Sequence, residues 1–420
     1  MKRFLCDECG HSLFFEDSQC TSCGRHLGYC AEAQKLVILP DEVARAQASF
    51  ALPGMGEDRY FSCRNRIEHA ACNWLVLAPP SPAPSARPPS ARSPSARPPS
   101  ARPPSARPPS ARPPSARPPS ARPPSDEPRQ LLYCRSCELT ELIPDLSNPS
   151  NLEAWIQVER AKRRLMYTLH ALNLPISSRA TDPQQGLAFR FLRGTKRQPV
   201  MTGHSAGVIT LNVAEAHAAF RENTREKLGE AYRTVLGHLR HEIGHYYWDR
   251  LIGHAAALDT FRSLFGDERQ DYEQAIQRHY GEGPSSDWAD SFISAYATMH
   301  PWEDWAETWA HYLHMQDTLE TAKSHGLVVR APGRDGVRVA MDAIAFRDFD
   351  SLSEGWQAVT LTLNNMSRSM GLPDAYPFVV SRPVQDKLRF IHQLIHERPE
   401  SPKSHRRTPA SSRAPAPPGE

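Results

Sequence analysis

Eight of the nine cysteines occur in closely spaced groups, and this spacing constrains the fold more than any other feature. The chain begins with two C-x-x-C pairs. Each such turn directs both of its thiolates to one point, so two turns can enclose one zinc ion. Intracellular thiols bind metal more often than they form disulfides. The spacing therefore predicts two structural zinc sites, the first made by Cys6, Cys9, Cys20 and Cys23 and the second by Cys63, Cys72, Cys134 and Cys137.

A proline-rich repeat interrupts the second group of cysteines. The unit Ser-Ala-Arg-Pro-Pro runs eight times over residues 85–124, with one lapse at Ser93. Its only apolar residue is alanine, so residues 79–125 cannot bury a core and are predicted to be disordered. Residues 1–78 and 126–147 would then form one small zinc-binding module. The repeat is either an expansion in a permissive loop or a docking arm for an acidic partner or a proline-binding module.

The charge distribution argues against an electrostatic partner for the folded part. The net charge is +3, and the repeat contributes eight arginines, so the remainder carries −5. Few Lys or Arg cluster in residues 1–78, which makes nucleic acid an unlikely partner. No apolar run approaches the roughly 18 residues that span a bilayer, and the six residues up to Cys6 are too few for a signal peptide. We therefore expect a soluble, cytoplasmic protein without a membrane partner.

The second half of the chain has the pattern of an α+β fold, predominantly helical with a small sheet. Ser150 and Glu153 resemble a capping box that opens a helix running towards Leu174. Two strands are predicted at 186–193 and 207–213. Helical periodicity predicts segments at 222–252, 268–280, 287–299, 302–316, 351–370 and 383–396. We expect residues 148–398 to form one domain and residues 399–420 to form a disordered tail.

The motif H-E-x-x-H lies within the predicted helix 222–252. His241 and His245 are four residues apart and share one helix face, so both imidazoles can bind one zinc ion. Glu242 can then act as general base toward a zinc-activated water. This arrangement predicts a catalytic zinc site, provided that a third ligand exists.

The third ligand must come from elsewhere in the chain. A metzincin would have glycine and histidine where this sequence has Trp248 and Leu251, so that class is excluded. Within the predicted helix 302–316, Glu303 and Glu307 lie on one stripe, and either could be the ligand. Asp249, one turn after His245, is a candidate for orienting a ligand imidazole or is a plain surface residue.

Several segments together resemble a bacterial family of zinc-binding metallopeptidases with an amino-terminal zinc-ribbon region. The catalytic part of the resemblance rests on RHEIGHYYWDRL (240–251), FGDER (265–269) and SAYATMHPWEDWAETWAHYLH (294–314). The front part rests on CNWLV (72–76), CRSC (134–137) and IPDL (143–146). The resemblance covers most of residues 1–78 and 130–396. It implies a metallopeptidase site and a zinc-ribbon module, and it names no substrate.

A more distant resemblance assigns roles to individual residues. The spacing from Tyr296 through Glu303 to Glu307 is similar to that of gluzincin toxins such as anthrax lethal factor. It implies that Glu303 is the third zinc ligand, Glu307 an outer orienting group and Tyr296 the donor that stabilises the oxyanion. By the same analogy, the strand 207–213 would be the sheet edge on which a peptide substrate adds as a further strand.

These observations favour a zinc-dependent metallopeptidase of the gluzincin type that hydrolyses peptide bonds, with one catalytic and two structural zinc ions and a peptide or protein as substrate. The alternative is a non-catalytic adaptor whose zinc ribbons bind protein or nucleic acid and whose H-E-x-x-H metal is structural. An intact Glu242 separates the two, because a structural site needs no base beside its ligands.

Overall fold

The computed structural model describes residues 2–41, 49–78, 133–195, 197–252, 255–330, 338–340 and 344–397. The repeat at 85–124 and the predicted tail at 399–420 lie outside the described residues, so the predictions made for them stay predictions. None of the helices in the described ranges is both long and apolar enough to cross a membrane.

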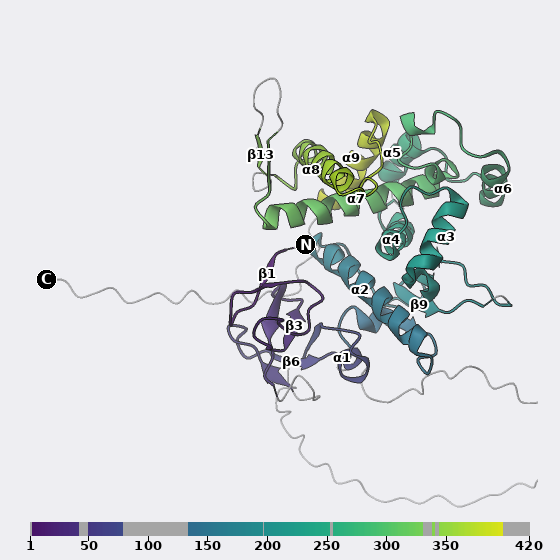
Figure 1. Cartoon of the computed structure of the whole chain (residues 1–420). Coiled ribbons are helices and arrows are strands. Elements are labelled where there is room, and N and C mark those ends of the chain that lie inside the picture. The colour runs from purple at the N-terminus through teal and green to yellow at the C-terminus, as the bar shows by residue number, and fades with distance from the viewer. Residues whose placement is uncertain are drawn as a thin grey trace, which may run out of the picture.

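The cysteine-rich amino-terminal region, drawn in purple in Figure 1, consists of short antiparallel strands and one short helix. The clustered cysteines up to Cys72 lie at or near the ends of these elements, where the chain turns. Its elements are β1 (Phe4–Leu5), β2 (Ser12–Leu13), β3 (Leu27–Cys30), β4 (Lys35–Ile38), β5 (Phe50–Ala51), β6 (Arg59–Ser62), α1 (Arg64–His69) and β7 (Leu75–Leu77).

The helical half contains one four-stranded sheet in the order β10-β11-β9-β8. Its strands are β8 (Thr140–Leu142), β9 (Ala188–Leu192), β10 (Gly203–Ser205) and β11 (Val208–Asn212). β9 pairs in parallel with β8 and β11, and β10 pairs antiparallel to β11. The prediction that the strand 207–213 is a sheet edge is therefore wrong, because β11 lies between two strands and β10 is the outer one. β8 also extends this sheet, although its sequence lies in the segment predicted to belong to the amino-terminal module.

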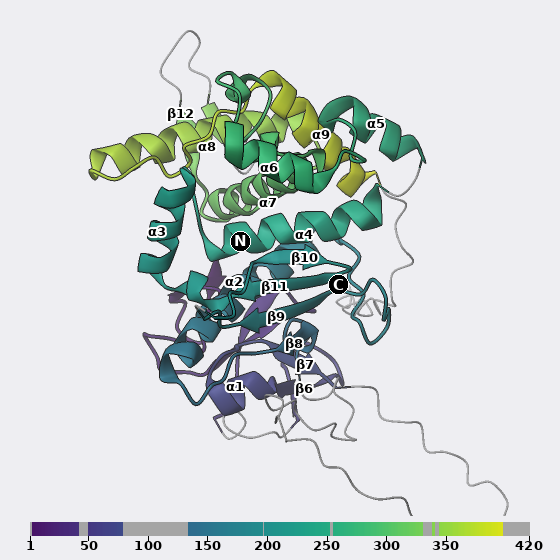
Figure 2. The same ribbon diagram turned by 90° about the vertical axis from the view of Figure 1, so that its right-hand side faces the viewer.

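Helices make up most of the rest, which confirms the predicted α+β class. They are α2 (Pro149–Ala171), α3 (Ala218–Leu228), α4 (Val235–Leu251), α5 (Ala255–Phe265), α6 (Tyr272–Glu282), α7 (Pro301–Ser324), α8 (Phe349–Ser369) and α9 (Arg382–His396). A short hairpin of β12 (Val328–Arg330) and β13 (Arg338–Ala340) follows α7. In Figure 2, α4 lies between the sheet below it and a layer above it that contains α7, α8 and α9.

Some predicted helix bounds are wrong, for local reasons. The segment 222–252 is two helices, because Gly229 ends α3 with φ of +64° and Thr234 caps α4 by accepting a hydrogen bond from the Gly237 amide. The segment 287–299 contains two 3₁₀ turns, η4 (Trp288–Asp290) and η5 (Tyr296–Thr298), in place of a helix. α2 is capped by Asn148 and not by Ser150. α5 was not predicted.

The amino-terminal module packs directly on α2. The Tyr167 ring lies 5.4 Å from that of Phe15 and 6.2 Å from that of Tyr29, and the His170 ring lies 6.2 Å from that of Trp74. One continuous group of buried apolar side chains extends from the module through α2 into the helical half. The two halves therefore share a hydrophobic core.

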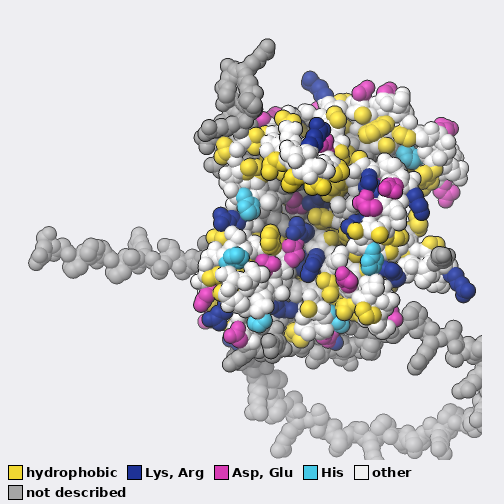
Figure 3. Space-filling model, in the orientation of Figure 1, with side chains coloured by type: hydrophobic (Ala, Val, Ile, Leu, Met, Phe, Trp, Pro, Cys, Tyr) yellow, Lys and Arg dark blue, Asp and Glu magenta, His cyan; other side chains and the backbone are white. Residues whose placement is uncertain are grey.

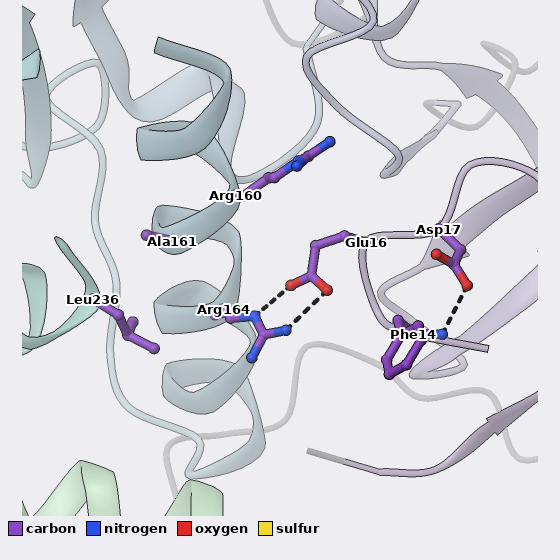
Figure 4. Close-up of a pocket in the computed structure, with 7 residues that line it drawn as sticks. All are labelled: Phe14, Glu16, Asp17, Arg160, Ala161, Arg164 and Leu236. Atoms are coloured by element: carbon purple, nitrogen blue, oxygen red, sulfur yellow. Dashed lines mark hydrogen bonds and ion pairs between the residues drawn. The ribbon is translucent and has the colours of Figure 1, made fainter. Parts of the chain in front are cut away.

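A shallow groove of about 570 Å³ runs along this junction. Figure 4 shows it between the loop that carries Phe14, the exposed side of α2 and Leu236 at the start of α4. Glu16 of the loop and Arg164 of α2 form a two-point ion pair across it. The pair fixes the edge of the module against α2.

Candidate metal centre

The contact between α4 and α7 brings the H-E-x-x-H motif and the second glutamate segment together. Gly244, inside the motif, permits this contact: a Cβ atom there would lie 3.0 Å from Cα of Ala306 and 3.2 Å from Cβ of Trp309. The indole nitrogen of Trp305 donates a 2.8 Å hydrogen bond to the Gly244 carbonyl. Trp305 and Trp309 of α7 thus pack on α4, and this packing turns Glu303 and Glu307 toward the histidines.

Three side chains converge at this crossing. Nε2 of His241 lies 3.2 Å from Nε2 of His245 and 3.0 Å from Oε2 of Glu303. Nε2 of His245 lies 3.5 Å from Oε1 of Glu303. One nitrogen or oxygen atom from each residue falls within 4.8 Å of the others, as three ligands of one ion must. The ligand set of two histidines and one glutamate matches that of catalytic zinc sites.

The electrostatics of these groups fit a bound cation. The Glu303 side chain is 2% exposed, and its Oε2 forms an ion pair with Nε2 of His241 at 3.0 Å. A buried carboxylate is costly unless a positive charge faces it. Burial opposes ionisation of Glu303, but the two histidines outweigh it and hold its pKa well below the ordinary value. Burial opposes protonation of His241, but Glu303 and Glu307 hold its pKa well above the ordinary value. The site therefore favours a positive charge at its centre.

Glu307 lies one turn further along α7 and contacts the other face of His241. Its Oε1 is 2.7 Å from Nδ1 of His241, and its Oε2 accepts a 2.6 Å hydrogen bond from the Ser294 hydroxyl. Burial opposes its ionisation, but the hydrogen bond to His241 dominates and lowers its pKa to about 2. A carboxylate in this position keeps a proton on Nδ1 and leaves Nε2 free to bind a metal.

Among the described residues, Glu242 is not part of the ion pairs that join His241, His245, Glu303 and Glu307. It is 8% exposed and makes no hydrogen bond or ion pair with any other residue that the structure describes. Burial raises its pKa above the ordinary value, although His241 and His245 work in the opposite direction. The motif thus contains a buried carboxylate with no structural partner.

Two tyrosines also lie beside the centre. The Tyr296 ring, in η5, lies 6.0 Å from the His241 ring, and burial and then Glu303 raise the pKa of its phenol. The Tyr272 hydroxyl, at the start of α6, donates a 2.7 Å hydrogen bond to Oε1 of Glu303. Nothing in the local sequence of Tyr272 or Ser294 marks either residue as part of the site, and neither was predicted. Both come from segments separated from α7 by turns.

Asp249 and His204 flank His245. Asp249 makes no hydrogen bond to His245 within the described residues. Burial raises its pKa while the charge of His245 works in the opposite direction. The ring of His204, in β10, stacks on the ring of His245 at 6.1 Å with an interplanar angle of 16°. This contact, which was not predicted, places the outer strand of the sheet beside the histidines.

The eight clustered cysteines form the two groups that their spacing predicts. The Sγ atoms of Cys6 and Cys23 are 3.7 Å apart, as are those of Cys9 and Cys20. A tetrahedron with metal–sulfur bonds of about 2.3 Å has edges of about 3.8 Å, so the spacing suits a zinc ion. All nine cysteines are free of disulfide bonds. Cys30 is buried in a separate apolar cluster and belongs to neither group.

The second cysteine group is buried between the module and α2. Sγ of Cys72 lies 3.7 Å from Sγ of Cys134 and accepts a hydrogen bond from the Trp74 amide at 3.3 Å. The buried guanidinium of Arg163, in α2, donates a 2.5 Å hydrogen bond to the carbonyl of Ala71, next to Cys72. Burial lowers the pKa of Arg163, but the cysteines outweigh it and raise it. A positive charge here offsets part of the negative charge of a four-thiolate site.

Comparisons with known proteins agree with this arrangement. A family model described as "Putative zinc-binding metallo-peptidase" matches residues 151–394, and a zinc-ribbon domain model matches residues 3–84. Proteins named as uncharacterized from Mycobacterium bovis and from two strains of Mycobacterium tuberculosis are each 40% identical over 398 residues, which cover 94% of this chain and 96% of the relative. No solved structure matches the chain. The chain therefore belongs to this family of zinc-binding metallopeptidases and carries an amino-terminal zinc ribbon.

Proposed function

We propose that the protein is a zinc-dependent peptidase of the gluzincin type that hydrolyses peptide bonds in peptides or proteins. His241, His245 and Glu303 would hold the catalytic zinc, and the two cysteine groups would each hold a structural zinc. The observation that carries this proposal is the convergence of the two Nε2 atoms and the Glu303 carboxylate beside the buried carboxylate of Glu242.

Each residue has a separate task in the proposed reaction. When bound, zinc polarises a carbonyl and makes water acidic near neutral pH. Glu242 accepts the proton of the attacking water and later delivers it to the leaving amine, a role for which its raised pKa is suited. Tyr296 donates a hydrogen bond to the oxygen on which negative charge develops. Glu307 holds the Nδ1 proton of His241, which keeps the imidazole ring in the metal-binding orientation.

The outer edge of β10 is the proposed place for the substrate backbone. β10 is the last strand of its sheet, and His204 in its centre stacks on His245. An extended peptide that adds to this edge would pair its main chain with β10 and lie beside the metal centre. This proposal moves the expected substrate edge from β11 to β10.

The alternative of a non-catalytic adaptor has less support. A structural metal site gains nothing from Glu242, because a buried carboxylate without a partner costs free energy. Nucleic-acid binding by the ribbon would require a basic surface. Figure 3 instead shows acidic side chains interspersed with the basic ones on this face of the molecule.

The test compares purified wild-type protein with the Glu242→Gln variant on a mixture of unfolded proteins, with cleavage sites identified by mass spectrometry. Gln keeps the size of the side chain and removes the base, so the variant should retain three zinc ions and lose turnover by at least about 100-fold. Glu226→Gln, an exposed position on α3, is the matched control and should behave as wild type. Equal cleavage by wild type and Glu242→Gln would contradict the proposal.

A further inference from the structure

The hydrogen bond from Tyr272 to Glu303 takes no part in the reaction steps proposed above. The Tyr272 hydroxyl lies 2.7 Å from Oε1 of Glu303, and Tyr272 is the first residue of α6. Glu303 is in the first turn of α7, so the two helices meet through their amino-terminal turns. The Tyr272 hydroxyl thus contacts one oxygen of the Glu303 carboxylate, and His241 contacts the other.

His300 braces the start of α6 against the start of α7. Its Nε2 donates a 3.1 Å hydrogen bond to the Gln270 carbonyl, and its Nδ1 accepts a 3.1 Å hydrogen bond from the Trp302 amide. The His300 ring also packs edge-on against the Tyr272 ring at 5.2 Å. Asp271 caps α6 by accepting a hydrogen bond from the Gln274 amide at 2.9 Å. The position of the Tyr272 ring is therefore fixed from both helices, independently of its hydroxyl.

The two oxygens of Glu303 consequently differ. Oε1 accepts the hydrogen bond from Tyr272 and lies 3.5 Å from Nε2 of His245, whereas Oε2 lies 3.0 Å from Nε2 of His241. A carboxylate on a flexible side chain has two equivalent oxygens and free rotation about its last bond. Holding Oε1 removes this freedom and keeps Oε2 beside Nε2 of His241.

We propose that Tyr272 is a positioning residue that holds Glu303 in the orientation required to bind the catalytic metal. The inference rests on the proposed role of Glu303 as a ligand. Loss of such an outer hydrogen bond weakens metal affinity by about 10- to 100-fold in other metal sites. Tyr296 acts differently, because its proposed contact is with the reacting carbonyl and its removal should leave metal affinity unchanged.

The test measures zinc affinity and requires no peptidase activity, so it can fail or succeed separately from the proposed function. The Tyr272→Phe variant removes only the hydroxyl and keeps the ring against His300. Zinc dissociation constants are obtained by titration against chelators of graded strength, with the two cysteine-bound zinc ions as an internal measure of folding. Tyr280→Phe, an exposed tyrosine of the same helix, is the matched control, and Tyr296→Phe is the comparison within the site.

We expect Tyr272→Phe to bind the histidine-site zinc about 10- to 100-fold more weakly than wild type, with both cysteine-bound ions retained. Tyr280→Phe and Tyr296→Phe should keep the wild-type affinity. An unchanged zinc affinity in Tyr272→Phe would overturn the proposal. Loss of the cysteine-bound ions in the same variant would also overturn it, because the hydroxyl would then serve folding and not Glu303.

Discussion

Replacing each of the two α7 glutamates in turn by alanine is the most direct test of the metal centre. Glu303→Ala removes one of three proposed ligands, so the histidine-site zinc should be lost together with all activity. Glu307→Ala removes a group that contacts His241 only at Nδ1, the nitrogen that does not face the other proposed ligands, at 2.7 Å. The metal should therefore remain bound, but less tightly.

The structure sets the size of the Glu307 effect. A hydrogen bond to a charged group contributes about 1.5–3 kcal/mol, and the bond between Glu307 and His241 is of this kind. This range corresponds to roughly 10- to 100-fold in zinc affinity. Ser294 loses the acceptor of its hydroxyl in this variant, but it keeps the hydrogen bond that it accepts from the Ala297 amide, which holds its position.

The assay is zinc competition against chelators, together with kcat/KM on a cleaved peptide. Asp249→Asn completes the series, and we expect it to keep wild-type affinity because no hydrogen bond joins Asp249 to His245 in the described residues. The reasoning is refuted if Glu307→Ala abolishes zinc binding at this site while Glu303→Ala leaves it intact. Glu307 would then be the ligand, and the resemblance to the toxin gluzincins would be misleading.

Two further predictions concern metal content and pH. Elemental analysis of protein purified without added metal should find three zinc ions per chain, and a value near one ion would contradict both cysteine assignments. Chelation should unfold the cysteine-rich module, because structural thiolate zinc contributes on the order of 10 kcal/mol to the stability of small modules. Burial, assisted by Arg135, lowers the pKa of His170 to about 4, so between about pH 6.5 and pH 4 the unfolded chain binds a proton that the folded chain excludes. The free energy of unfolding should therefore fall as the pH is lowered through this range, by up to about 3 kcal/mol for this residue. Urea titrations at several pH values should show that the free energy of unfolding of His170→Gln depends less on pH than that of wild type. An equal dependence on pH in the two proteins would contradict the lowered pKa of His170.

The sequence reveals those parts of the site whose geometry is local. His241 and His245 share a helix face because of the helical period, and each C-x-x-C pair is one turn. Glu303 and Glu307 could be found as a pair for the same reason, but helical periodicity alone did not distinguish them. The distinction depends on how α7 crosses α4, which the close approach at Gly244 determines.

The parts that the sequence did not reveal depend on distant segments. Tyr272, Ser294 and His204 reach the site from α6, a turn and a strand, and each contact requires the complete fold. The segment 287–299 has apolar residues at helical spacing, yet the Ser294 hydroxyl binds Glu307 and accepts from the Ala297 amide, which favours a turn there. A glycine is typical of a helix end, so Gly229 could have indicated where α3 ends. The prediction of one continuous helix through this residue was wrong.

The packing of the zinc ribbon on α2 determines how this protein can be divided. Phe15, Tyr29 and Trp74 cover Tyr167 and His170, so a fragment that begins at α2 would expose an aromatic surface to water. Exposed apolar surfaces of this kind cause aggregation. The zinc-ribbon match ends at residue 84, and the metallopeptidase match begins at residue 151. We therefore expect that the two matched segments do not fold independently of each other. Expression of residues 148–398 by themselves should yield insoluble protein, and a chain shortened only within 85–124 is the smaller form to prepare.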